Sequence, residues 1–450
     1  MSSPATVVER MWAYDATLWT GADEDRWLGW LDVVTRMRPR VGELTSFAES
    51  AAEQFDAYVL LGMGGSSLAP EVLRRAFEAA SFHVLDTTHP EAIRRLERTL
   101  DLERTLFLVS SKSGSTLETR SHADYFWERC EGRGAQFAAI TDPGSELERV
   151  ARERGFRAVF PGEPEIGGRY SALSMFGVVP GALMGVDAGR FLDRAQEMMD
   201  ACRLEAGNPG LELGLQLGES WQAGRDKVCI DDHPSGFGLW AEQLLAESTG
   251  KQGKGLIPAP GEPPDGADRQ RGDVRLPDPY DLGQEFLRWE FATAVAGHLL
   301  GINPFDQPDV QAAKDKTSEV LERDDVALYP EGSLDELLAQ ARPGDYVAIQ
   351  AFIDPARQHE LSPLLDRARE TGCVVTCGLG PRYLHSTGQL HKGGPGTGLF
   401  VQVVDELGEE IPIPGRDFGF GRLICSQAAG DLAALEERGR RVIRLRLEDL

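Results

Sequence analysis

The chain has 450 residues, 41% of them hydrophobic, and a formal net charge of −25. This length predicts two domains, and the acidic balance argues against binding to nucleic acids or anionic membranes, which requires a basic face. We expect no signal peptide and no transmembrane helix, because the sequence has neither a basic start followed by an apolar stretch nor an apolar run of about 18 residues. The six scattered cysteines favour a reducing, cytoplasmic location.

Apolar residues at helical spacing predict a helical segment over residues 1–44. Strands then alternate with helices from residue 45 to 195, a pattern typical of βαβ units and a parallel sheet. The expected strands are 57–61, 82–86, 105–109, 136–141 and 157–160. The expected helices are 71–80, 91–100, 116–129 and 145–154.

The second half, residues 205–450, repeats this alternation without repeating the sequence. Its expected strands are 227–231, 345–352, 372–378, 399–404 and 441–445, with a helix at 360–371. The stretch 256–282 is rich in Pro, Gly and Asp, and we expect a long loop there. The predicted fold class is therefore α/β, with two domains that are each a parallel sheet flanked by helices in three αβα layers. Ligands of such sheets bind at the carboxyl ends of the strands.

Two loops at strand ends are candidates for an anion site. Ser-Ser-Lys-Ser-Gly-Ser-Thr at 110–116 separates the third expected strand from a helix, and Gly-Met-Gly-Gly-Ser-Ser at 62–67 follows the first. Hydroxyls and N–H groups at a helix N-terminus hold an anion without net positive charge, and glycine lets the backbone approach a ligand. Neither loop has the Walker or dinucleotide pattern. A capped helix and a tight turn are the structural alternatives.

Four further positions carry side chains suited to acid–base chemistry. Arg169 follows two glycines and suits the stabilisation of an oxyanion. Glu247 lies among small and apolar residues at a helix end, where desolvation raises the pKa of a carboxyl group toward that of a general base. His385 lies among Ser, Thr and Gln residues, and Asn-Pro-Phe-Asp-Gln at 303–307 is followed by Lys314. Taken singly, Arg169 and Glu247 are more often surface residues, and a lone histidine is usually structural.

Together, six segments resemble the phosphoglucose isomerase family, which has two sugar-isomerase (SIS-type) domains. The segments are Gly-Gly-Ser at 64–66, Ser-Lys-Ser-Gly-Ser-Thr-Leu-Glu-Thr at 111–119, Gly-Gly-Arg-Tyr-Ser at 167–171, Glu-Ser-Thr-Gly-Lys at 247–251, Asn-Pro-Phe-Asp-Gln at 303–307 and Leu-His-Ser-Thr-Gly-Gln at 384–389. The resemblance runs from about residue 56 to 430 and is greatest to the isomerase half of bifunctional transaldolase/phosphoglucose isomerase proteins.

The resemblance implies an isomerase that interconverts glucose 6-phosphate and fructose 6-phosphate through a cis-enediol, without metal or cofactor. It implies that Glu247 moves the proton, Arg169 stabilises the enediolate, and His385 and Lys314 open the sugar ring. The implied ligand-binding residues are Gly65, Ser66, Ser111, Lys112, Ser113, Thr116 and Gln307.

The resemblance also implies a cytoplasmic homodimer. It leaves open whether His385 serves its own site or that of the neighbouring subunit, whether mannose 6-phosphate is accepted, and whether a separate transaldolase is a partner. A non-catalytic SIS module that senses a sugar phosphate is the alternative from another class. That alternative needs the phosphate loop but not the four acid–base residues together.

Overall fold

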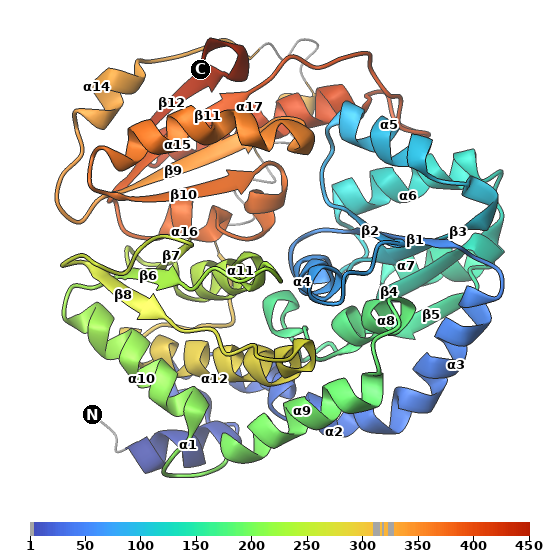
Figure 1. Ribbon diagram of the computed structural model, residues 1–450, viewed down its shortest axis with the longest axis horizontal. Coiled ribbons are helices and arrows are strands. Elements are labelled where there is room, and N and C mark those ends of the chain that lie inside the picture. The colour runs from blue at the N-terminus through green and yellow to red at the C-terminus, as the bar shows by residue number, and fades with distance from the viewer. Residues whose placement is uncertain (1–3, 309–315, 317–318, 323–327) are drawn as a thin grey trace.

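The first half of the chain forms a five-stranded parallel sheet in the order β2-β1-β3-β4-β5 (Figure 1). The structure is a computed structural model, and the residues described are 4–308, 316, 319–322 and 328–450. The strands are β1 (Ala57–Gly62), β2 (Phe82–Leu85), β3 (Thr105–Ser110), β4 (Phe137–Thr141) and β5 (Ala158–Pro161). The central strands β3 and β4 are buried along their whole length, as expected of a parallel sheet covered on both faces.

Helices cover both faces of this sheet. One face packs against α3 (Val41–Ala52), α4 (Leu68–Ala76) and α8 (Met175–Leu183). The other packs against α5 (Pro90–Thr99), α6 (Leu117–Arg129) and α7 (Glu146–Glu153). Within the sheet Gly62 pairs with Ser110, so the loops that follow β1 and β3 begin side by side. The expected strands and helices of the first half are thus present, with ends that differ by a few residues.

The second half holds two parallel sheets, with strand orders β10-β9-β11-β12 and β7-β6-β8. The strands are β6 (Lys227–Ile230), β7 (Ile257–Pro260), β8 (Arg269–Gly272), β9 (Tyr346–Phe352), β10 (Val374–Leu379), β11 (Gly398–Val404) and β12 (Arg441–Arg446). Apolar side chains of both sheets, among them Ile257 and Phe400, share one buried cluster. The second half is therefore continuous in its core although its strands form two sheets.

The prediction of a single long loop over residues 256–282 is wrong, because β7 and β8 lie inside it. Both strands pair with β6, where Val228 faces Pro258 on one side and Gln270 on the other. Proline argues against a strand in sequence reasoning because it cannot donate a ladder hydrogen bond. Pro258 and Pro260 are accommodated because β7 is an edge strand of its sheet.

Long helices and the N-terminal segment join the two halves. The long helices are α9 (Ala188–Ala201), α10 (Pro209–Gln222), α11 (Phe237–Thr249) and α12 (Leu282–Leu300). The other helices are α1 (Pro4–Trp12), α2 (Val33–Met37), α14 (Leu334–Leu338), α15 (Ser362–Arg369), α16 (Gly388–Gly393) and α17 (Phe420–Glu437). The expected domain boundary at residue 195 falls inside α9, so the first half ends in a helix rather than a linker.

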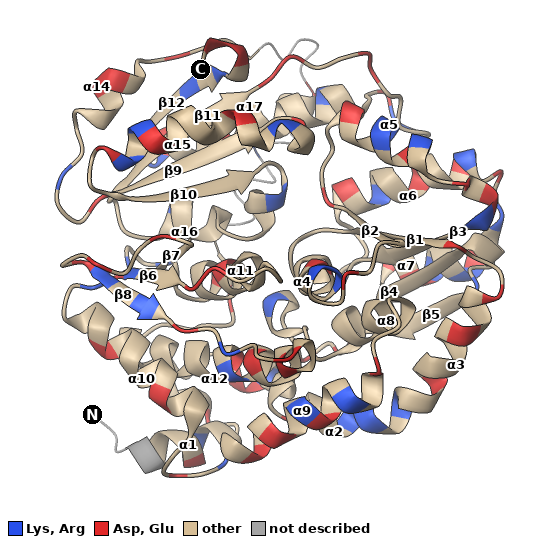
Figure 2. Ribbon diagram, in the orientation of Figure 1, with Lys and Arg blue, Asp and Glu red and all other residues tan. Residues whose placement is uncertain are grey.

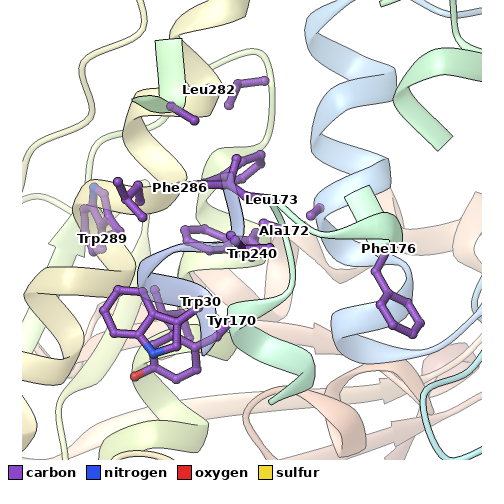
Figure 3. Close-up of a cluster of buried hydrophobic side chains, with 14 of the residues drawn as sticks. Trp30, Tyr170, Ala172, Leu173, Phe176, Trp240, Leu282, Phe286 and Trp289 are labelled. Carbon is purple, nitrogen blue, oxygen red and sulfur yellow. The ribbon is translucent and has the colours of Figure 1, made fainter. Parts of the chain in front are cut away.

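Aromatic side chains from distant parts of the chain meet in the largest core (Figure 3). Trp240 of α11 lies edge-on to Phe286 of α12, with ring centroids 4.6 Å apart. Trp30 of the N-terminal segment stacks on Tyr170 at 5.3 Å. The N-terminal segment is therefore part of the common core rather than an appendage to it.

Charged residues of both signs are interspersed along the outer helices (Figure 2). The net charge of −25 is thus spread over the surface elements, and the two signs lie close enough to form many ion pairs. Among the described helices, none is long and apolar enough to cross a membrane.

Candidate active site

A cavity of about 490 Å³ lies where the loops after β1 and β3 meet residues of the second half. Of the residues expected at the site, those that line this cavity are Gly65, Ser66, Lys112, Ser113, Thr116, Arg169, Glu247, Gln307 and His385. They come from segments more than 300 residues apart in the sequence, and the volume falls in the range typical of small-ligand sites. Lys314 lies outside the described residues.

The 110–116 loop ends at the N-terminus of α6. Thr116 is the N-cap residue of this helix, and Gly114 has φ +70°, a conformation that L side chains rarely adopt. The Ser113 and Thr116 side chains line the cavity. Because the helix N-terminus carries partial positive charge and free N–H groups, the loop suits a phosphate.

Ser111 differs from the expectation because it does not line the cavity. Its side chain is buried, and its hydroxyl lies 3.2 Å from the Thr116 Oγ1 and accepts a hydrogen bond from the Gly114 N–H at 3.2 Å. Ser111 therefore stabilises the conformation of the loop through hydrogen bonds within it. Ser111 directly follows the buried strand β3, and its side chain points away from the cavity. The hydroxyls of Ser113 and Thr116, later in the loop, reach the cavity.

The Lys112 ammonium is engaged by other protein groups. It forms an ion pair with Asp142 and donates to the backbone carbonyl of Glu163 at 3.0 Å. Burial raises the pKa of Asp142, and the neighbouring ammonium opposes this shift. An anion in this loop would therefore be held mainly by hydroxyls and backbone dipoles, which need no net positive charge.

The two glycine-rich loops approach each other closely. A Cβ atom on Gly65 would lie 2.1 Å from the carbonyl oxygen of Gly168, so only glycine fits there. This contact places the turn after β1 against the turn that carries Arg169. Arg169 therefore lies beside the loop after β1, and both line the same cavity as the 110–116 loop.

Arg169 is almost fully buried, and protein groups hold its guanidinium in place. Nε donates to the Ser248 Oγ at 2.8 Å, and Nη2 donates to the Pro304 carbonyl at 2.7 Å. Nη1 donates to the Gln307 Oε1 and lies 3.6 Å from the Glu247 Oε1. A buried cation fixed before the ligand arrives stabilises developing negative charge without reorganisation.

Glu247 stands in the last turn of α11, and its side chain reaches the cavity wall. The residue is 8% exposed, so a small ligand would complete its desolvation. Gln243, one turn earlier, donates from Nε2 to the Glu247 Oε2 at 3.0 Å and to the His385 carbonyl at 2.8 Å. Gln243 therefore joins the carboxylate to the His385 segment, a role that a glutamine inside a helical pattern does not reveal.

His385 reaches the cavity of its own chain, at the end of the 3-10 helix Arg382–His385. Its Nε2 lies 2.8 Å from the Glu118 Oε1, which also accepts from the Gln427 Nε2 at 2.7 Å. A carboxylate only accepts hydrogen bonds, so the neutral imidazole carries its hydrogen on Nε2 and keeps the Nδ1 lone pair. Sequence reasoning missed Glu118 because an acid in the first turn of a helix is common.

Lys251 ties α11 to the loop that carries Gln307. Its buried ammonium donates to the Asn303 carbonyl at 2.8 Å and to the Asp306 Oδ1 at 2.6 Å. Burial, together with the nearby Arg169 guanidinium, lowers the pKa of Lys251 to about 8. Within the described ranges, no group of three or more His, Cys, Asp or Glu residues is placed to hold a metal ion.

The parallel sheets and the anion loop beside a carboxylate, an arginine and a histidine define a SIS-type α/β protein. A hypothetical protein from Thermus thermophilus has this fold, with a TM-score of 0.51 and 22% identity over 98% of this chain and 83% of its own. A glucose-6-phosphate isomerase from Chlamydia trachomatis matches with a TM-score of 0.55 and 20% identity, over 64% of this chain and 74% of its own.

Sequence comparison finds similarity to one family. Residues 32–210 match the phosphoglucose isomerase family model. Glucose-6-phosphate isomerase of Nostoc sp. is 36% identical over 217 residues, which are 45% of this chain and 41% of that relative. A probable glucose-6-phosphate isomerase of Methanococcus maripaludis is 25% identical over 65% of this chain and 84% of its own length. The chain is thus similar to the phosphoglucose isomerase family over residues 32–210, and it spans about two-fifths of the length of the Nostoc relative.

Proposed function

We propose that the protein is a glucose-6-phosphate isomerase, which interconverts glucose 6-phosphate and fructose 6-phosphate. The observation that carries the proposal is the meeting of the anion loop, Glu247, Arg169, Gln307 and His385 around one cavity. An aldose–ketose isomerisation needs these parts: an anion site, a carboxylate base and a cation at the substrate oxygen.

The first chemical step opens the sugar ring. The phosphate occupies the turn at Ser113 and Thr116. His385 accepts the proton of the anomeric hydroxyl at Nδ1 and donates it to the ring oxygen as the bond between C1 and this oxygen breaks. Glu118 supports this step because it fixes the Nε2–H tautomer and stabilises the imidazolium form. We also keep Lys314 as a participant in ring opening, as the family resemblance implies.

The second step moves a proton between C2 and C1. Glu247 takes the C2 proton of the open aldose, and the electron pair forms the carbon–carbon double bond of the enediolate. Arg169, with its guanidinium already fixed, balances the negative charge on the oxygen. The hydroxyl proton on O2 moves to O1, and Glu247 returns its proton to C1 as the C2 carbonyl forms, which completes the ketose.

A coupled dehydrogenase assay with fructose 6-phosphate, without added metal, tests this proposal. We expect turnover by the parent and a fall of at least about 100-fold in Glu247→Gln. Glu242→Gln is the matched control, since Glu242 stands on the same helix but lines a different cavity. Parent protein without turnover, or Glu247→Gln within about threefold of the parent, would contradict the proposal. The same assay with mannose 6-phosphate decides the substrate range.

The assembly and location also remain proposals. We propose a cytoplasmic homodimer, in which the described free cysteines fit a reducing compartment. Because His385 reaches the cavity of its own chain, a dimer is not required to supply this side chain. Sedimentation that finds an active monomer would contradict the homodimer.

A further inference from the structure

The segment that precedes the family match lies against the active-site loop. In this segment Trp19 contacts Phe305 edge-on at 5.2 Å, and its Nε1 donates to the Ala294 carbonyl at 2.8 Å. Trp30 stacks on Tyr170, the neighbour of Arg169 (Figure 3). Residues 15–31 thus contact both the segment that carries Phe305 and the segment that carries Arg169. The family match begins only at residue 32.

Two side chains of this segment, Asp23 and Trp27, line the active-site cavity itself. The Trp27 Nε1 donates to the Asp23 Oδ2 at 3.2 Å, and the Asn303 Nδ2 donates to the Asp23 Oδ1 at 3.1 Å. The buried Glu24 carboxylate accepts from the backbone N–H of Thr20 at 2.9 Å and holds the turn. The pair is therefore prearranged, half-buried and turned toward the space that a ligand would fill.

We propose that Asp23 and Trp27 form the wall of the cavity that recognises the sugar portion of the substrate. The indole offers an apolar face for the C–H face of a sugar, and the carboxylate oxygens accept hydrogen bonds from hydroxyl groups. A carboxylate also repels a phosphate, so Asp23 directs that group toward the hydroxyls of the 110–116 loop. This inference rests on the proposed function and adds how the bound sugar is selected and oriented.

Calorimetric binding of two ligands separates this wall from the phosphate loop. Glucose 6-phosphate would contact both, whereas inorganic phosphate contacts only the loop. We expect Trp27→Leu to bind glucose 6-phosphate about tenfold more weakly than the parent, with phosphate binding within about twofold. Trp12→Leu is the matched control, because Trp12 is also half-buried in the N-terminal segment and donates to a backbone carbonyl, that of Cys202. Both affinities should stay at the parent value in this control.

Asp23→Asn tests the wall without loss of volume. We expect about tenfold weaker binding of glucose 6-phosphate and unchanged or tighter binding of phosphate. Asp15→Asn, in the same segment but outside the cavity, should change neither. Trp27→Phe should recover most of the affinity lost in Trp27→Leu, since it keeps an aromatic face.

Unchanged sugar-phosphate affinity in either Trp27→Leu or Asp23→Asn would overturn the inference. An equal loss for both ligands would also overturn it, because the effect would then lie in the phosphate loop. If Trp27→Leu does not fold, Asp23→Asn and Trp27→Phe decide the question. Affinity and product formation are separate readouts, so a parent that binds glucose 6-phosphate without converting it contradicts the proposed function and leaves this test intact.

Discussion

Glu118→Gln removes one negative charge beneath His385 and leaves the shape of the side chain nearly unchanged. The carboxylate is 6% exposed and accepts from both the His385 Nε2 and the Gln427 Nε2. A hydrogen bond to a charged group contributes about 1.5–3 kcal/mol, against about 0.5–1.5 kcal/mol for a neutral one. We therefore expect to lose about 1–2 kcal/mol of stabilisation when the imidazole takes up a proton, which is about a tenfold slower ring-opening step.

Exchange between the α and β anomers of glucose 6-phosphate, followed by NMR, measures ring opening without proton transfer at carbon. Glu118→Gln should slow this exchange about tenfold, and Glu247→Gln should leave it near the parent rate while isomerisation is lost. Glu128→Gln is the control, since Glu128 is an exposed carboxylate on the same helix. Anomer exchange by Glu118→Gln within about twofold of the parent would refute the assigned role of the Glu118–His385 pair.

Three further predictions concern the loop, the phosphate and acid stability. Lys251→Met should lower kcat/KM at least about tenfold, because it leaves the carbonyl groups of the 303–306 loop without their hydrogen-bond donor. The activity of the parent should fall above about pH 8, because the Lys251 ammonium loses its proton there. Ser113→Ala should weaken inhibition by inorganic phosphate about tenfold, and Ser115→Ala, outside the cavity, should change it less. Burial lowers the pKa of His122 from 6.5 to about 4, so only the unfolded chain takes up this proton between those values. The stability that neutral His122 contributes is therefore complete above pH 6.5 and falls by about 3 kcal/mol by pH 4. Chemical denaturation should show that the free energy of unfolding of His122→Gln falls less on acidification than that of the parent. His359→Gln, the control, should lose as much as the parent.

The alternation of strands and helices was predictable from the sequence because each buried strand of a parallel sheet is a short apolar run. The segments 57–61 and 105–109 match β1 and β3 for this reason. The strands β7 and β8 were not predictable, since their residues, such as Pro258 and Arg271, do not form apolar runs. Their partner β6 determines their pairing, and a partner distant in sequence is invisible to local patterns.

The candidate site residues that lie in recognisable motifs were predictable from the sequence. The residues that contact or position them from elsewhere in the chain were not. Glu247 and Arg169 stand in such motifs, and the structure places them 3.6 Å apart. Asp23 and Gln427 stand in ordinary polar contexts and acquire a place near the site only through tertiary contacts. Ser111 shows a different limit of sequence reasoning. Its motif indicates the loop, but it does not indicate the direction in which the Ser111 side chain points.

The measurement that tests the account most directly is isomerisation of glucose 6-phosphate in deuterated water. If Glu247 carries the proton between C2 and C1, solvent deuterium should enter at C1 in the fraction of turnovers in which the protonated carboxyl group exchanges before it returns its proton. Glu247→Gln should then produce neither ketose nor exchange at C2. Ketose formed by Glu247→Gln at the parent rate, or exchange at C2 that persists in this variant, would contradict the account.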